Sequence, residues 1–115
     1  MNRDEFLLQH KKLCDEAHNI LQEKVQNYSG GGNVFTNFSR VESLGICSTP
    51  TGILARISDK FGRLITHTNT KGGLVGEEGF HDSIIDLINY LVFLYCSTNP
   101  RRIDDGKDTD RTETG

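Results

Sequence analysis

Apolar residues recur every three to four positions along most of this chain, which is the spacing of amphipathic α-helices. The long stretches of this kind are residues 4–26, 48–66 and 77–95, and a shorter one at 40–46 follows an apolar turn at 35–38. No stretch alternates apolar and polar residues over any length, as a half-buried strand would. The sequence therefore predicts an all-α fold, a small helical bundle of about four helices.

The ends of these stretches carry residues that start or stop helices. Asn2 or Asp4 can cap the first helix, and Ser48 or Thr49 can cap the third, because their side-chain oxygens accept hydrogen bonds from free backbone amides. Gly45 is expected to end the short helix, since glycine readily adopts the backbone conformation found there.

Length and composition predict a single domain at residues 1–98. Residues 99–115 contain one apolar residue, Ile103, so they are expected to form a disordered polar tail. Only 35% of the chain is apolar, which allows a modest core. Because such a small chain often buries part of an apolar helix against another subunit, a homo-oligomer is predicted, with contacts through the first and last helices.

Charge, cysteine content and apolar run length indicate which partners and which cell compartment to expect. The net charge of −3 gives no electrostatic footprint for duplex nucleic acid. Three widely spaced cysteines without a CxxC pair are typical of free thiols in a reducing compartment. No signal peptide is recognised, and the longest apolar run, Leu91 to Cys96, is too short to span a membrane. A cytoplasmic protein is the resulting expectation.

The last helix carries an acidic stripe, defined as Glu78, Asp82 and Asp86, with Asn89 on the same arc. Carboxylates one helical turn apart can share Mg²⁺, which prefers oxygen ligands and can activate a water. The same spacing is also found on solvated helix faces and on faces paired with lysine or arginine. The stripe is therefore a candidate magnesium site with two structural alternatives.

The helix predicted at 48–66 carries a basic stripe, defined as Arg56, Lys60 and Arg63, spaced four and three residues apart. Arginine binds phosphate in a bidentate geometry and lysine acts as a mobile point charge. The alternative is a ladder of salt bridges to the acidic stripe. The two interpretations are compatible, because an acidic and a basic helix that face each other can hold the phosphates of a nucleotide.

The glycine-rich segment at 27–33 contains one further candidate for ligand contacts, Tyr28, and a second candidate, Asn37, follows it. The segment lacks the Gly-Lys-Ser/Thr of a P-loop, but an aromatic ring and an amide can stack on and read a base. Phe35 and Phe38 nearby are expected to anchor the core. No HExxH or GxSxG motif is present, so covalent catalysis is not expected.

Three blocks of the sequence resemble one family of small phage and bacterial proteins. The blocks are K-V-Q-N-Y…F-T-N-F at 24–38, G-I-L-A-R-I-S-D-K-F-G-R-L at 52–64 and E-x-x-x-D-x-x-x-D-L-x-N-Y at 78–90. They are similar to the signatures of the first nucleotide modification associated domain family, whose name reflects genome neighbourhood. The resemblance implies a nucleotide ligand and, for a phage protein, the cytoplasm of an infected bacterium.

That family in turn looks like the all-α nucleoside triphosphate pyrophosphohydrolases of the MazG and dimeric dUTPase kind. Those enzymes hold Mg²⁺ with an E-x-x-E and an E-x-x-D pair on neighbouring helices. In this chain Glu78 and Asp82 match the second pair at a spacing of four instead of three, and they are the implied catalytic residues. The first pair is missing, since Glu16 and Glu23 are seven residues apart.

Three functions remain open from the sequence. The first is Mg²⁺-dependent hydrolysis of a nucleoside triphosphate, and the second is a non-catalytic sponge that sequesters a nucleotide immune signal. The third is a structural bundle in which the two stripes pair with each other. In the first, the acidic stripe holds the metal, the basic stripe neutralises the phosphates, and the side chains that orient base or sugar are Tyr28, Asn37 and Asn89. In the second, the basic stripe binds the ligand without a metal.

Overall fold

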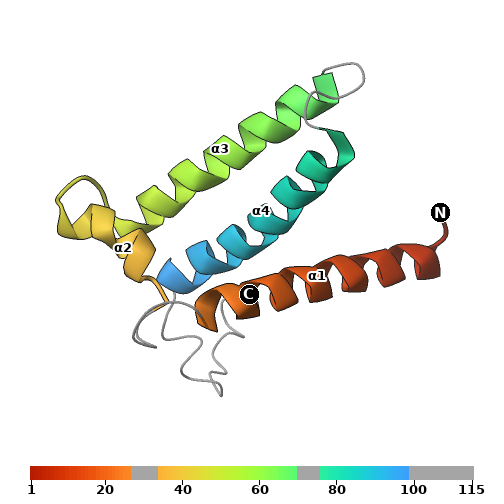
Figure 1. Cartoon of the computed structure of the whole chain (residues 1–115), viewed down its shortest axis with the longest axis horizontal. Helices are drawn as coiled ribbons and strands as arrows, with labels where there is room; N and C mark the ends of the chain where they lie inside the picture. Colours follow the sequence, from red (N-terminus) through yellow and green to blue (C-terminus); the bar gives the residue numbers. More distant parts are fainter. Residues whose placement is uncertain (27–33, 70–75, 99–115) are drawn as a thin grey trace, which may run out of the picture.

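A computed structural model describes residues 1–26, 34–69 and 76–98, and within the last range it describes side chains from Gly79 onward (Figure 1). The described residues form four helices and no strand, which confirms the all-α prediction. The glycine-rich segment with Tyr28, the side chain of Glu78 and the tail 99–115 lie outside the described residues. The helices are α1 (Arg3–Gln26), α2 (Thr36–Ser43), α3 (Thr49–Asn69) and α4 (Gly76–Thr98).

Two helix starts are capped as the sequence indicates. At α1, the Asn2 side-chain oxygen accepts the Glu5 backbone N–H at 2.8 Å, and the Glu5 carboxylate accepts the Asn2 N–H at 2.9 Å. This reciprocal pair satisfies two amides that lack helical partners. At α3, the Ser48 hydroxyl accepts the Thr51 N–H at 3.2 Å. Asn2 and Ser48 are therefore the caps among the alternatives that the sequence left open.

Helix α2 joins the apolar turn expected at 35–38 and the start of the short helix expected at 40–46 into one element. The Ser39 N–H donates to the Phe35 carbonyl at 2.7 Å, so the helix begins directly after Phe35. Gly45 ends this segment as predicted, with a φ of 78° that favours glycine.

Helix α2 lies close against α3 for two local reasons. The Glu42 carboxylate accepts the Thr49 N–H at 2.8 Å and the Thr49 hydroxyl at 2.7 Å, and these bonds lower the pKa of Glu42. At Gly52, a Cβ atom would lie 2.9 Å from a methyl carbon of Val41. Glycine is thus required at this position for the two helices to approach.

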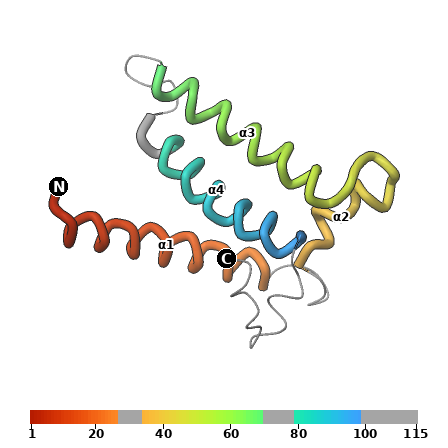
Figure 2. Tube along the Cα trace, turned by 180° about the vertical axis from the view of Figure 1, so that it is seen from behind, coloured from red at the N-terminus to blue at the C-terminus, as the bar shows by residue number. Residues whose placement is uncertain are grey.

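Helix α4 is the centre of the fold, because it packs against α3 on one side and α1 on the other (Figures 1 and 2). The described helices α1 and α3 do not contact each other. The core lies where α2, α3 and the C-terminal half of α4 converge, and its buried members are Phe38, Ile53, Ile57, Leu87 and Phe93. Phe38 is buried there, as the sequence predicts for a core anchor.

Burial of α4 is less complete than its wide apolar arc suggests. Leu91, Val92 and Tyr95 are 50%, 53% and 43% exposed, because no other described helix covers that side of α4. None of the described helices is both long and apolar enough to cross a membrane.

Two polar contacts join α1 to α4. The Asn89 side-chain N–H donates to the Ala17 carbonyl at 3.1 Å, and the His81 Nε2 lies 2.8 Å from the Glu16 Oε2. The hydrogen bond that the His81 imidazole donates to the Glu16 carboxylate is the main cause that raises the pKa of His81 above its usual value, and the charges of Glu16 and Asp82 add to it. The His81–Glu16 contact is therefore strongest when the imidazole is protonated.

This contact predicts that the stability of the fold depends on pH. Because the pKa of His81 is higher in the folded than in the unfolded chain, its contribution is fully present below about pH 6.5, the unfolded pKa. It is lost as the pH rises through the folded pKa. Urea unfolding between pH 5.5 and 8.5 should show a wild-type advantage over His81→Gln that shrinks with rising pH. An advantage that stays constant or grows with pH would contradict this assignment.

Candidate functional site

A pocket of about 180 Å³ lies at the convergence of the four helices. Helix α1 contributes its C-terminal part, α2 its first turns, and α3 and α4 one face each. The lining residues are Leu21, Lys24, Asn37, Phe38, Arg56, Asp86, Asn89, Tyr90 and Phe93. The pocket thus brings together four of the residues singled out in the sequence, from three separate helices: Asn37, Arg56, Asp86 and Asn89.

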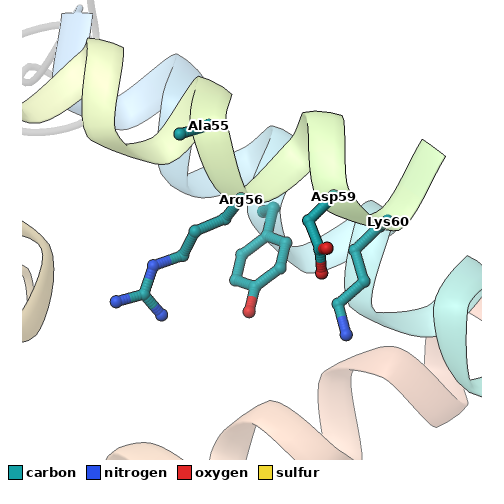
Figure 3. A pocket seen from close by; sticks show the side chains of 5 residues that line it. Ala55, Arg56, Asp59 and Lys60 are labelled. Atoms are coloured by element: carbon teal, nitrogen blue, oxygen red, sulfur yellow. The ribbon is translucent and has the colours of Figure 1, made fainter. Parts of the chain in front are cut away.

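A second, shallower pocket of about 350 Å³ adjoins the first. It is lined by Ala55, Arg56, Asp59, Lys60 and Tyr90, so the two pockets share Arg56 and Tyr90. Figure 3 shows the side chains of Arg56, Asp59 and Lys60 extending from the same side of α3. Together the pockets form one continuous candidate site with a smaller and a shallower compartment.

Aromatic rings form the apolar wall of the smaller compartment. The Phe38 ring centroid lies 4.7 Å from that of Phe93 and 6.1 Å from that of Tyr90, in tilted and edge-on arrangements. Phe38 and Phe93 also belong to the buried core. The wall is therefore held by core packing, which keeps its shape fixed before any ligand arrives.

Two cations of the site have no carboxylate partner among the described residues. The Arg56 guanidinium carbon lies 5.0 Å above the Phe38 ring centroid, within the range of a cation–π contact. This contact orients Arg56 and leaves its N–H donors free of a described acid. Lys24, near the end of α1, is exposed and lines the smaller compartment.

Lys60 and Asp86 link the basic and acidic stripes. The Lys60 Nζ lies 3.0 Å from the Asp86 Oδ2, and the two side chains are only 19% and 27% exposed. The structural alternative, in which the stripes pair with each other, is thus confirmed for this pair. Arg63 instead pairs with Asp59 on its own helix, at 3.4 Å, and lines neither pocket.

The predicted magnesium site is only partly described. Asp82 is exposed and Asp86 contacts Lys60, while the Glu78 side chain lies outside the described residues. Among the described side chains, no group of three or more His, Cys, Asp or Glu lies close enough together to hold a metal. The three-carboxylate site, and the catalytic role of Glu78 and Asp82, stay predictions.

The two asparagines offer polar groups to the smaller compartment. The Asn89 amide nitrogen donates one N–H to the Ala17 carbonyl, which leaves its second N–H and its carbonyl oxygen for a ligand. Asn37 is exposed at the rim. Sequence reasoning did not assign Lys24, Tyr90 or Phe93 to the site, although Lys24 and Tyr90 lie at the ends of the resemblance blocks.

Three comparisons, with protein-family models, with curated proteins and with solved structures, found no match to this chain. The resemblance to the nucleotide modification associated family and to MazG-like enzymes therefore stays a prediction. Functional inference rests on the residues of the pocket.

The Lys60–Asp86 pair is predicted to stabilise the junction of α3 and α4. Lys60→Met leaves Asp86 partly buried without a cation, so we expect a loss of about 1–3 kcal/mol in the free energy of unfolding, between the values for exposed and buried pairs. The double variant Lys60→Met/Asp86→Leu should recover most of that loss. Urea unfolding of both variants measures the coupling.

Arg63→Met is the matched control, because it breaks the exposed Arg63–Asp59 pair on the same helix. It should cost less than about 0.5 kcal/mol. Equal losses for Lys60→Met and Arg63→Met, or no recovery in the double variant, would show that the Lys60–Asp86 pair has no special structural role.

Proposed function

We propose that this protein binds a nucleotide at the junction of its four helices. The observation that carries the proposal is Arg56, which is oriented over an aromatic ring, faces both compartments and has no described carboxylate partner. An arginine held in this way is suited to a planar, multiply charged acceptor such as phosphate.

In this proposal the smaller compartment receives the base. Its volume of about 180 Å³ suits one aromatic ring system, and the exposed edge of its wall includes Tyr90. Stacking of a base on an aromatic side chain contributes about 1–3 kcal/mol to binding. The carbonyl oxygen of Asn89 and the amide of Asn37 supply the acceptors and donors that would read the edge of the base.

The phosphates would lie in the shallower compartment against Arg56 and Lys60. Although the whole chain has a net charge of −3, the two compartments together carry three cations and two carboxylates. One of those carboxylates, Asp59, also pairs with Arg63. A locally positive site on an acidic protein favours an anionic ligand at that position.

The Lys60–Asp86 pair supports binding that does not depend on a metal. Asp86, one of the three predicted metal ligands, already has a cation of the chain at 3.0 Å. Arg56, which has no described carboxylate partner, can then supply the positive charge that phosphates require, with Lys60 as a hydrogen-bond donor beside it. We therefore favour a non-catalytic binder, such as a protein that sequesters a nucleotide signal, and the resemblance to phage proteins makes an infected bacterium its expected setting.

Arg56→Gln tests the phosphate contact. Loss of a charge-assisted bond worth about 1.5–3 kcal/mol should weaken nucleotide binding by about 10-fold or more. The measurement is isothermal titration with nucleoside phosphates and cyclic nucleotides in the presence of EDTA. Arg63→Gln removes the same charge from the same helix outside both pockets and should leave affinity unchanged. If both variants weaken binding equally, the effect is general electrostatics and the proposed contact is wrong.

Magnesium-dependent hydrolysis is the second candidate, favoured by the position of Asp82. This carboxylate lies one turn before Asp86 on α4, is exposed and forms no ion pair with a described residue. Together with Glu78 it would supply the oxygen ligands that Mg²⁺ prefers. Bound Mg²⁺ would supply charge neutralisation and water activation for phosphate cleavage.

Asp82→Asn discriminates this second candidate. If the protein is an enzyme, nucleoside triphosphate turnover requires Mg²⁺ and is abolished by Asp82→Asn, whereas binding in EDTA is retained because Asp82 lines neither pocket. Products separated by chromatography give the readout. Absence of turnover in the wild type removes the candidate, and turnover that survives Asp82→Asn rejects the assigned acid.

A further inference from the structure

An apolar patch lies on the side of α3 and α4 opposite the candidate site. Its six members are 43% to 59% exposed: Leu54, Phe61, Ile65, Leu91, Val92 and Tyr95. By comparison, only seven apolar residues are buried among all the described residues, the five core members together with Ala17 and Ile85. A large share of the apolar side-chain surface of these two helices therefore faces outward.

Helical geometry places the patch on one continuous face. At about 100° per residue, Leu54, Phe61 and Ile65 fall within one narrow arc of α3, roughly opposite Arg56. On α4, Leu91, Tyr95 and Val92 span an arc of about 100° by the same rule, and this arc is centred roughly opposite Asp86. Helices α3 and α4 lie side by side (Figure 2). Because both direct their pocket residues to one side, helical geometry places the two apolar arcs next to each other on the other side.

The patch has no described acidic or basic side chain within it. The residues that continue its arc on α4 are Ile84 and Ile88, which are half-buried, and the polar residue between Leu54 and Phe61 on α3 is Ser58. A partner surface with charges at its centre would lose their hydration without gaining an ion pair. The patch therefore fits an equally uncharged surface.

The area of the patch matches the requirement of a stable dimer. A fully exposed aromatic side chain presents about 150–250 Å² and an aliphatic one less, so six half-exposed side chains, two of them aromatic, present at most roughly 600 Å². Two such patches in contact would bury roughly 1,200 Å², the lower limit of specific protein interfaces. At about 25 cal/mol per Å² this is a substantial gross stabilisation, from which the entropy of association must be subtracted.

We infer that this patch binds the same patch of a second copy of the chain in a dimer with twofold symmetry. A twofold interface joins identical surfaces, so an uncharged, apolar patch is its own complement. The proposal moves the predicted interface from the first and last helices to α3 and α4. In such a dimer the candidate site of each copy faces away from the interface, so each copy binds its ligand independently. It does not depend on the proposed function.

The test is the mass of the full chain in solution by sedimentation equilibrium over a range of concentrations. The wild type should show twice the mass of one chain. Leu91→Glu and Val92→Lys each place a charge in the patch and should give the mass of one chain at the same concentrations. Thr66→Glu is the control for Leu91→Glu, because it adds the same negative charge at an exposed position of α3 outside the patch. This variant should remain dimeric.

Circular dichroism distinguishes dissociation from unfolding, and both substituted side chains are at least 50% exposed in the single chain, so neither change removes a buried residue. A monomeric wild type overturns the inference. A dimer that survives both patch variants also overturns the inference. A dimer that Leu8→Glu on α1 dissociates and Leu91→Glu does not would place the interface on α1 instead of the patch. Nucleotide titration of the monomeric variants separates the dimer inference from the proposed function. Their affinity for any nucleotide that the wild type binds should equal that of the wild type, because the patch and the candidate site lie on opposite sides of α3 and α4.

Discussion

The contact between Lys60 on α3 and Asp86 on α4 is the interaction on which the polar half of this structure depends. It joins the central helix to its main neighbour at 3.0 Å, with both side chains largely covered. A charge in this position is costly without its partner, so each residue fixes the other. Arg56 lies one turn before Lys60 on α3 and Tyr90 one turn after Asp86 on α4, and both line the two compartments. Core packing and the electrostatics of the site are thereby coupled at one place.

The same coupling applies to the aromatic wall. Phe38 is buried in the core, carries the guanidinium of Arg56 over its ring and lines the smaller compartment. A change at Phe38 would therefore alter stability and binding together. Changes at Arg56 act on the rim of the site, where its own charge is not part of a described ion pair. Variants of Arg56 on α3 are therefore better probes of ligand binding than variants of Phe38, because they change the charge of the site without changing the core.

The fold was largely predictable because helical periodicity is a local property. The four helices and the caps at Asn2 and Ser48 follow from residues a few positions apart. Asn37, Arg56 and Asn89 were found by residue type and spacing, and the structure brings them to one pocket. Lys24 and Tyr90 could not be assigned, because their place in the site depends on how α1 and α4 pack. The pairing of Lys60 with Asp86, in preference to Arg63, likewise depends on the register between α3 and α4.

The central claim is that the site holds a nucleotide without a metal and without chemistry. Equilibrium dialysis against nucleoside mono-, di- and triphosphates and cyclic dinucleotides, in EDTA, followed by heat denaturation and chromatography, tests it most directly. The account predicts that one class of nucleotide is retained and returns unchanged after heating. Retention of none of them, or retention only with Mg²⁺ and release as products, would contradict it.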